Sequence, residues 1–216
     1  MPNLITLDGD SPSVQYLCQK DKRLAKVIHM VGPSSYVPHD EDAYPFLIHE
    51  IIEQMLSIKA GQKIYGRLED LCHGNITPEQ IALLSDEQIR SVGTSSAKVN
   101  YIRNMTNAIM GGSICLEQIK NLSDEDVIKT LTKIRGIGKW TAKMYLIFVL
   151  DRPDVLPVED GAFLQAYRWV YKTEDCSEKS VYNKCKKWKP YSSIASRFLY
   201  RALDAGLTKQ EFHLFK

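Results

Sequence analysis

The chain has 216 residues, of which 44% are hydrophobic and 25% charged, so it can bury a sizeable core and is neither disordered nor of low complexity. No apolar run is long enough to span a bilayer and no N-terminal segment resembles a signal peptide, so we expect a soluble, intracellular protein without membrane association. The net charge is only +2, but residues 1–119 carry 10 Lys and Arg against 14 Asp and Glu, whereas residues 120–216 carry 18 against 12. The basic half indicates a surface that faces a polyanion, although solvated helix faces would give the same charge count.

The cysteines are odd in number, scattered along the chain, and form no CxxC pair. A zinc ribbon, a redox pair and an iron–sulfur cluster all need closely spaced cysteines, so this pattern excludes them. We therefore expect free thiols in a reducing compartment at the five positions, Cys18, Cys72, Cys115, Cys176 and Cys185.

Helix signals dominate the chain from one end to the other. Apolar residues recur at helical spacing between Phe46 and Leu56. Strand signals are sparse, with no long alternation of apolar and polar residues and no Asn-Gly hairpin. Hydroxyl residues that can cap a helix, each with a polar residue three positions later, are Thr77 with Gln80, Ser85 with Gln88, Ser123 with Asp126 and Thr208 with Glu211. The sequence predicts an all-α protein of roughly ten helices.

The stretch IRGIGKWTA at residues 134–142 predicts two helices joined by a glycine turn. The first helix should begin at Ser123 and end near Ile134, and the second should run from about Lys139 to Leu150. Both glycines of the turn permit a tight reversal, because glycine takes positive φ without steric cost.

This turn also has the features of an anion site. The second helix would direct the free N–H groups of its first turn, with their partial positive charge, at the glycines. Gly136 and Gly138 would let a phosphate approach closely, and Lys139 and Thr141 would add a charge and a hydroxyl. A helix connection that binds no ligand is the alternative.

The hairpin is followed by DRPDVLPVED at residues 151–160, and the pair in this order and spacing resembles the helix-hairpin-helix (HhH-GPD) DNA glycosylase superfamily. The segments PFLIHEIIEQMLSIKAGQKI (45–64) and KKWKPYSSIASRFLYRALD (186–204) are similar to those of alkylpurine, or 3-methyladenine, DNA glycosylases. The likeness covers about residues 40 to 205. It implies one HhH-GPD domain over residues 1–216, with two helical subdomains flanking a base-binding cleft and no β domain. The N-terminal residues, about forty in number, would pack as a helical extension.

The resemblance implies an enzyme that flips a damaged base out of the duplex and cuts its N-glycosidic bond. The family's catalytic aspartate falls on Asp160, whose carboxylate would stabilise the oxocarbenium-like transition state and orient or deprotonate water. Asp160 would also cap the helix GAFLQAYRWVY that follows it, and the two roles are compatible. Glu159 is expected to be a surface or structural acid.

Other roles follow by position. The resemblance places Trp140 and Tyr200 in the base pocket, where cationic alkylated purines would stack. Met55 falls on the wedge that fills the gap left by the flipped base, with core packing as the alternative. Glu53 stands where the family usually has glycine, and a carboxylate there could weaken DNA binding. The residues expected to bind DNA phosphate are Gly136, Ile137, Gly138, Lys139 and Thr141.

The resemblance also implies a Na⁺ or K⁺ ion at the hairpin, held by the backbone carbonyls of Thr132, Ile134 and Gly136; no other cofactor is expected. Members that also nick the strand carry a Schiff-base lysine at the position of Trp140. Lys139 is one residue away, and on a helix that offset turns it by about 100°. The chain should therefore leave an abasic site.

We thus expect a monomeric, monofunctional glycosylase that removes alkylated purines, of the 3-methyladenine and 7-methylguanine type, from double-stranded DNA. One alternative is a glycosylase of the same superfamily for a different base, such as a mismatched pyrimidine. Another is a helix-hairpin-helix DNA-binding module that has lost catalysis. Glu53 is the main argument for the inactive module, and Asp160 is the argument against it. HEIIE from His49 begins like a zinc-protease helix, but Glu53 replaces the second histidine.

Overall fold

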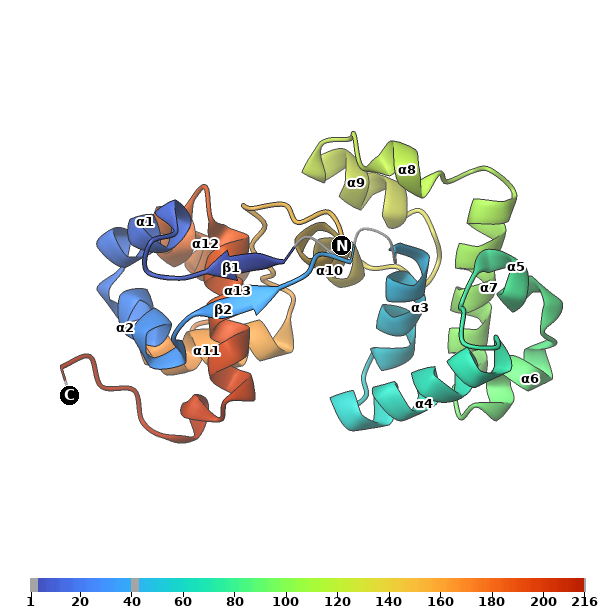
Figure 1. Cartoon of the computed structure of the whole chain (residues 1–216), viewed down its shortest axis with the longest axis horizontal. Coiled ribbons are helices and arrows are strands. Elements are labelled where there is room, and N and C mark those ends of the chain that lie inside the picture. Colours follow the sequence, from blue (N-terminus) through green and yellow to red (C-terminus); the bar gives the residue numbers. More distant parts are fainter. Residues whose placement is uncertain (1–3, 40–42, 216) are drawn as a thin grey trace. The chain divides into compact units, whose positions relative to one another are not determined.

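A computed structural model describes residues 4–39 and 43–215. The chain forms two compact units (Figure 1). The terminal unit combines Met1–Pro38 with Asp151–Lys216, and the central unit is His39–Leu150. Both units are built mainly of helices, as the sequence predicts, and every helix in the described part of the chain is too short or too polar to cross a lipid bilayer.

The terminal unit brings together the two ends of the sequence. Its elements are β1 (Ile5–Leu7), α1 (Pro12–Lys20), α2 (Lys22–Val31), β2 (Ser34–Tyr36), α11 (Gly161–Tyr171), α12 (Glu178–Cys185), the 3₁₀ turn η2 (Lys186–Trp188), α13 (Ser192–Asp204) and the 3₁₀ turn η3 (Leu207–Lys209). The strands form a two-stranded antiparallel sheet in which Ile5 pairs with Tyr36. This sheet was not predicted, because strands of three residues are too short to show an alternating pattern.

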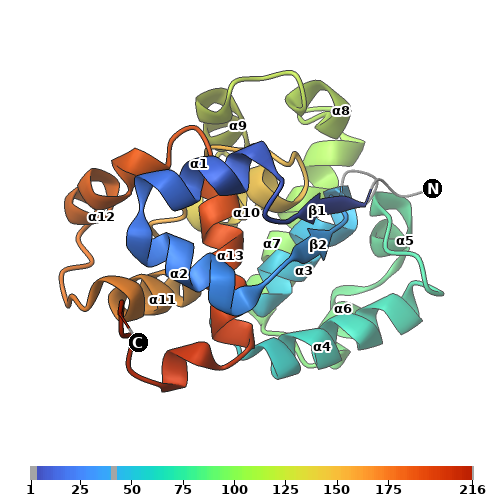
Figure 2. The same cartoon turned by 60° about the vertical axis from the view of Figure 1, so that its left-hand side comes forward.

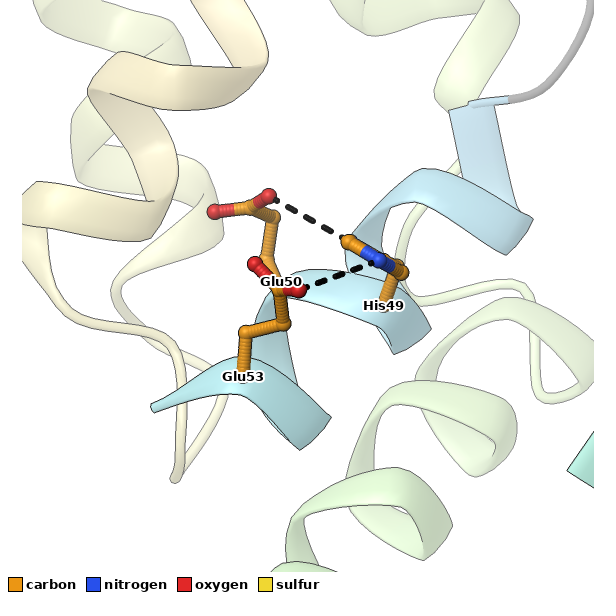
Figure 3. A group of neighbouring side chains, drawn as sticks. All are labelled: His49, Glu50 and Glu53. Carbon is orange, nitrogen blue, oxygen red and sulfur yellow. Dashed lines mark ion pairs between the residues drawn. The ribbon is translucent and has the colours of Figure 1, made fainter. Parts of the chain in front are cut away.

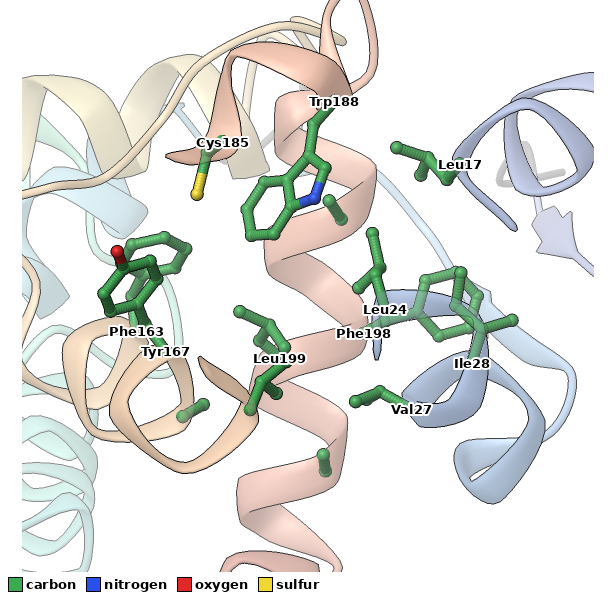
Figure 4. Close-up of a cluster of buried hydrophobic side chains, with 14 of the residues drawn as sticks. Leu17, Leu24, Val27, Ile28, Phe163, Tyr167, Cys185, Trp188, Phe198 and Leu199 are labelled. Carbon is green, nitrogen blue, oxygen red and sulfur yellow. The ribbon is translucent and has the colours of Figure 1, made fainter. Parts of the chain in front are cut away.

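Helix α13 is the centre of the terminal unit and packs against α2 and α11 (Figures 1 and 4). Phe198 and Leu199 of α13 meet Leu24 of α2 and Phe163 of α11 in a fully buried core. Removing such side chains from water supplies most of the stability of a unit this small. The segment before Pro38 is thus part of this core.

Asp21 is a buried carboxylate that ties the N-terminal segment to the C-terminal part of the same unit. It is 2% exposed and caps α2 by accepting from the N–H groups of Arg23 and Leu24. It also accepts from the Trp188 indole N–H (3.0 Å) and from the Tyr171 hydroxyl. Burial alone would raise the pKa of Asp21, but these hydrogen bonds and the Lys187 ammonium lower it below its ordinary value.

The central unit holds the remaining helices: α3 (Ala43–Glu53), α4 (Ile58–Leu71), α5 (Pro78–Leu83), α6 (Asp86–Ser91), α7 (Ser96–Met110), α8 (Leu116–Ile119), α9 (Asp124–Leu131) and α10 (Lys139–Phe148). Helix α3 packs against α4, α7 and α10, and the second view shows α3 beside α7 (Figure 2). Leu47, Ile48, Ile51 and Ile52 of α3 are fully buried, which explains its apolar spacing.

The predicted caps of the central unit are confirmed. Thr77 accepts from the N–H of Gln80 (3.2 Å), and Ser123 accepts from that of Asp126 (3.2 Å). Ser85 and Gln88 form a reciprocal capping box. The fourth predicted cap, at Thr208 in the terminal unit, is wrong: the chain makes only the short turn η3 there.

Candidate nucleic-acid interface and catalytic site

The predicted hairpin joins α9 to α10 in the central unit. Helix α9 ends at Leu131, three residues before the predicted end, and α10 begins at Lys139 as expected. Gly136 has φ +108°, and a Cβ on it would lie 2.3 Å from the ring of Tyr101. Gly138, by contrast, has φ −94°, so the expected positive φ is present only at Gly136.

Gly138 is the N-cap of α10 and lies at an open surface. It is exposed, and no atom lies within 4 Å of the position of its missing Cβ. Lys139 next to it is also exposed. The first turn of α10 directs its N–H groups, which have no acceptor inside the helix, toward this surface. The combination is what an anion site requires.

Two residues of the hairpin contribute less to this surface than the sequence suggested. The Thr141 side chain is 1% exposed, and its hydroxyl has no hydrogen-bond partner within the described residues, so it cannot add a hydroxyl to the surface. The Ile137 side chain is buried and its N–H donates to the Ile134 carbonyl (3.0 Å). What remains at the surface is Gly138, Lys139 and the first-turn N–H groups.

Met55 lies in the turn between α3 and α4. Its side chain is fully exposed (101%), so the alternative of core packing is wrong. Its backbone has φ +59°, a left-handed conformation that costs about 1–2 kcal/mol for a residue with a side chain. Leu56 and Ile58, also exposed, add apolar surface beside it.

The structure links the Met55 turn to the hairpin through a residue that the sequence analysis did not single out. The side-chain amide of Gln54 donates to the Gly136 carbonyl (3.0 Å). A second missed residue is Lys98 of α7, whose ammonium donates to the carbonyls of Ile52 (2.8 Å) and Gln54 (2.7 Å). Neither contact has a local signal in the sequence, because each joins residues more than forty positions apart.

Glu53 does not project into solvent as a free carboxylate. Its side chain lies against Gly61 of α4, where a Cβ would be only 2.6 Å from its Cγ. Its carboxylate pairs with the Nε2 atom of His49, one turn earlier on α3, at 3.4 Å. Glycine at position 61 thus provides the room for the side chain at position 53.

His49, Glu50 and Glu53 form one cluster at the end of α3 (Figure 3). The ligand atoms of the three residues lie within 4.8 Å of one another, close enough to hold a metal ion. However, the His49 Nδ1 atom faces Glu50 (3.7 Å) while its Nε2 atom faces Glu53. A metal ion would use only one ring nitrogen, whereas a protonated imidazole donates from both. The geometry therefore fits a protonated imidazole between two carboxylates.

Electrostatics agree with this interpretation. Burial acts to lower the pKa of His49, but the carboxylates of Glu50 and Glu53 outweigh burial and raise that pKa above its ordinary value. Burial raises the pKa of Glu53, and the nearby Glu50 adds to the rise, against the opposing effect of His49. Glu53 is therefore the ion-pair partner of His49 within the central unit.

Asp160 lies in the terminal unit as the N-cap of α11. Its Oδ1 atom accepts from the Phe163 N–H (2.6 Å), and the residue is 8% exposed, whereas Glu159 is exposed. The cap predicted from sequence is present. The cap fixes the direction of this carboxylate at the start of α11, as stabilisation of a cationic transition state requires.

The loop that leads to Asp160 is anchored on α13. Asp154 accepts from the N–H and hydroxyl of Ser192, and the Ser193 hydroxyl accepts from the Val155 N–H (2.9 Å). The Ser193 N–H donates to the Pro153 carbonyl (3.0 Å). Both serines lie in the family-like segment at residues 186–204, but the sequence alone does not predict that they hold this loop.

The two predicted aromatic residues lie in different units. Tyr200 is a half-buried residue of α13 that packs against the core of the terminal unit. Trp140 is half-buried near the start of α10 in the central unit. The terminal unit thus carries Asp160 and Tyr200, and the central unit carries Trp140 together with Met55 and the hairpin.

Comparisons with known proteins agree with the sequence motifs. A family model described as HhH-GPD superfamily base excision DNA repair protein matches residues 48–190. DNA-3-methyladenine glycosylase 1 of Schizosaccharomyces pombe is 31% identical over 184 residues, which are 83% of this chain and 80% of that protein.

Solved structures show the same relationship. A DNA-3-methyladenine glycosidase from Bacillus halodurans has a TM-score of 0.83 and 34% identity over 97% of each chain. The S. pombe 3-methyladenine DNA glycosylase Mag1, in complex with abasic DNA, has a TM-score of 0.81 and 29% identity over 90% of this chain and 97% of that one. The resemblance and the all-α fold class predicted from sequence are confirmed. The chain belongs to the HhH-GPD superfamily of base excision DNA repair proteins.

Proposed function

We propose that this protein is a monofunctional DNA glycosylase that removes alkylated purines of the 3-methyladenine type from double-stranded DNA. The observation that carries the proposal is Asp160: a buried carboxylate, fixed as a helix N-cap, at the family's catalytic position. Relatives whose names specify 3-methyladenine support the choice of substrate. Such a function would place the protein's work inside the cell, on chromosomal DNA.

The proposed reaction breaks the bond between C1′ of the sugar and the purine nitrogen. The bond's electron pair leaves with the base, whose alkylation makes it cationic and therefore a good leaving group. Positive charge then develops on the sugar, and the Asp160 carboxylate would stabilise it. Water adds to C1′ and loses a proton to Asp160 or to solvent, which leaves an abasic site.

The central unit would hold the DNA. The N-terminus of α10 with Gly138 and Lys139 would bind a phosphate, and exposed Met55 would fill the space of the flipped base. Trp140 of the central unit and Tyr200 of the terminal unit stay the candidates that the resemblance offers for stacking on the base. The position of Glu53 against α4 weakens the argument for an inactive DNA-binding module, because its charge is shared with His49.

Two of the three backbone carbonyls proposed to hold the hairpin ion already accept one hydrogen bond each. The Ile134 carbonyl accepts from the Ile137 N–H and the Gly136 carbonyl accepts from Gln54, each at 3.0 Å. Each oxygen keeps a second lone pair, so a Na⁺ or K⁺ ion would share these with the Thr132 carbonyl. The ion would neutralise carbonyl dipoles near a phosphate, and the reaction itself would require no cofactor.

The test is base release from matched duplexes that bear 3-methyladenine, 7-methylguanine or a mismatched pyrimidine. We expect release of the alkylated purines, by a protein that runs as a monomer in gel filtration. The product strands should stay full-length until treated with hot alkali, and borohydride should trap no covalent adduct, because Trp140 replaces the amine that forms an imine. Release of the mismatched pyrimidine alone would indicate the rival substrate, and no release from any duplex would refute the proposal.

A further inference from the structure

The end of α3 must reverse sharply before α4 begins at Ile58. Helix α3 ends at Glu53, and the chain closes the turn with a hydrogen bond from the Leu56 N–H to the Glu53 carbonyl (2.9 Å). Met55 takes the left-handed conformation within this turn. The last carbonyls of any helix lack donors inside the helix, so such a turn needs partners from elsewhere to be held.

Lys98 supplies those partners. It lies in the first turn of α7, and its ammonium donates to the carbonyls of Ile52 (2.8 Å) and Gln54 (2.7 Å). The ammonium therefore lies at the negative end of the α3 dipole, where a cation is favoured. Partial burial lowers the pKa of Lys98, in keeping with a side chain directed inward and not into solvent.

The contact with Gln54 acts directly on Met55. The Gln54 carbonyl and the Met55 N–H belong to one planar peptide group, so fixing that oxygen fixes the plane from which the Met55 backbone turns. On the other side, the Gln54 side chain donates to the Gly136 carbonyl of the hairpin. The residue before Met55 is thus held by its backbone to α7 and by its side chain to the hairpin.

The Met55 backbone takes part in the reversal after α3, but nothing in that reversal calls for a large apolar side chain at this position. Its side chain is fully exposed and contributes nothing to a core, yet the backbone that carries it is in a disfavoured region. We propose that Lys98 is a positioning residue that holds the Met55 turn so that Met55 can fill the gap left in DNA by the flipped base. The proposal rests on the proposed function and extends it to a residue that touches neither the base nor the sugar.

The test is a double-mutant cycle between Lys98→Met and Met55→Ala. Lys98→Met keeps the apolar stem and removes the donors. Single-turnover base release is measured on two duplexes, one with the lesion paired and one with the lesion opposite an abasic site. The second lesion has no partner to separate from, so it should need the wedge much less.

We expect Lys98→Met to slow release from the paired lesion by about tenfold to a hundredfold, the range for a displaced positioning group. The loss should be under about threefold opposite the abasic site, and Met55→Ala with Lys98→Met should be no slower than Met55→Ala alone. Lys98→Arg, which restores donors and charge, should recover most of the rate. Equal losses on both duplexes, or additive losses in the double variant, would show that Lys98 serves the fold only.

Controls separate this proposal from the proposed function. Lys63→Met removes an exposed charge of α4 in the same unit and should leave the ratio of the two rates unchanged. If Lys98→Met does not fold, Lys98→Gln, which keeps a neutral donor, replaces it. The fluorescence of 2-aminopurine beside the lesion reports unstacking without chemistry. If the wild type unstacks but releases no base, the proposed function fails while the Lys98 test still holds; if Lys98→Met unstacks as well as the wild type, the positioning proposal fails.

Discussion

Asp160 combines two roles that call for the same orientation of its side chain. Capping α11 fixes the direction of an acceptor oxygen, and stabilisation of a cationic sugar needs a carboxylate that is fixed in direction. Glu159, its neighbour, is exposed, whereas Asp160 is buried and caps α11. This difference in burial supports our proposal that Asp160, and not Glu159, carries the chemistry.

Asp160→Asn should abolish most base release while preserving the fold. The amide oxygen can still accept from the Phe163 N–H, so α11 keeps a cap. Loss of one preorganised charge is expected to cost about 2.7–4 kcal/mol, or on the order of 10²–10³ in rate. Single-turnover kinetics on a 3-methyladenine duplex measure this, with Glu159→Gln as the matched control. A rate for Asp160→Asn close to that of the wild type would be inconsistent with the assignment.

Met55 places a large side chain at a left-handed turn position where glycine would cost less. In Met55→Gly the left-handed backbone loses its steric cost of about 1–2 kcal/mol, and the greater freedom of glycine in the unfolded chain returns roughly 0.5–1 kcal/mol of that gain. We therefore expect a free energy of unfolding equal to or slightly above that of the wild type, together with at least a tenfold loss of base release. Urea denaturation tests the predicted stability, and single-turnover kinetics test the predicted loss of base release. A clearly destabilised Met55→Gly variant, or one with normal activity, would contradict this account.

At the scale of elements, the hairpin uses its two glycines differently. Gly136 has positive φ and lies against the ring of Tyr101, whereas Gly138 has ordinary backbone angles and open space around it. Gly136→Ala should therefore lower the free energy of unfolding by about 2–4 kcal/mol, through strain and overpacking. Gly138→Ala should change stability by less than about 0.5 kcal/mol.

Gly138, whose replacement should hardly change stability, is expected to matter for DNA binding. Gly138→Asp adds a negative charge at the proposed phosphate site, so affinity should fall about tenfold or more for damaged and undamaged duplexes alike. The loss should shrink at high salt. Fluorescence anisotropy at two salt concentrations measures this loss of affinity. If Gly138→Asp binds DNA as tightly as the wild type, the hairpin only connects two helices and is not a phosphate site.

The cluster at the end of α3 predicts a pH dependence of stability. The pKa of His49 is raised on folding, so its contribution is complete below the unfolded value of about 6.5 and is lost as pH rises through the folded value. The pKa of Glu53 is raised too, so its contribution has the same sign and fades above about pH 4.5. Lowering the pH from alkaline to mildly acidic should therefore stabilise this part of the unit.

His49→Gln should flatten the dependence of the free energy of unfolding on pH above about 6.5, the unfolded value from which the pKa of His49 is raised. Urea denaturation at several pH values provides the slope, and His29→Gln, a change at an exposed histidine of the terminal unit, is the control. Addition of Zn²⁺ should leave the wild type's stability unchanged, because the ring nitrogens face separate carboxylates. Identical slopes for the wild type and His49→Gln would contradict the protonated-imidazole interpretation.

At the scale of the whole molecule, the sequence predicts features that depend on neighbouring residues but not contacts between residues far apart in the chain. Ser85 and Gln88 predict a helix start because the cap lies within one turn. The cap at Asp160 was likewise predicted from adjacent residues and is confirmed, whereas its catalytic role stays a prediction. The contact of Lys98 with Gln54 depends on how α7 packs against α3, which no local pattern encodes. The same holds for Gly61, whose missing side chain makes room for Glu53.

The N-terminal segment poses the same problem at the largest scale, because Asp21 joins it to residues about 150 or more positions later in the chain. We expected a helical extension there, but neither its two short strands nor a buried carboxylate that joins it to Tyr171 and Trp188 could be predicted. Asp21→Asn keeps the shape of the side chain but removes a charge that several donors share. We expect the free energy of unfolding at pH 7 to fall by about 1–3 kcal/mol, the range for a buried hydrogen-bonded group left incompletely satisfied.

The pH dependence should distinguish Asp21 from a general packing defect. Its pKa is lowered on folding, so its contribution is present above the unfolded value of about 3.9 and is lost as pH falls through the folded value. The wild type and Asp21→Asn should therefore differ most near neutral pH and converge as the solution is acidified below about pH 4. Urea denaturation followed by circular dichroism at pH 7 and about pH 3 measures the difference, with Asp10→Asn as the control at an exposed acid. A difference that stays constant down to the acid limit would mean that shape, not the charge of Asp21, joins the N-terminal segment to the rest of the terminal unit.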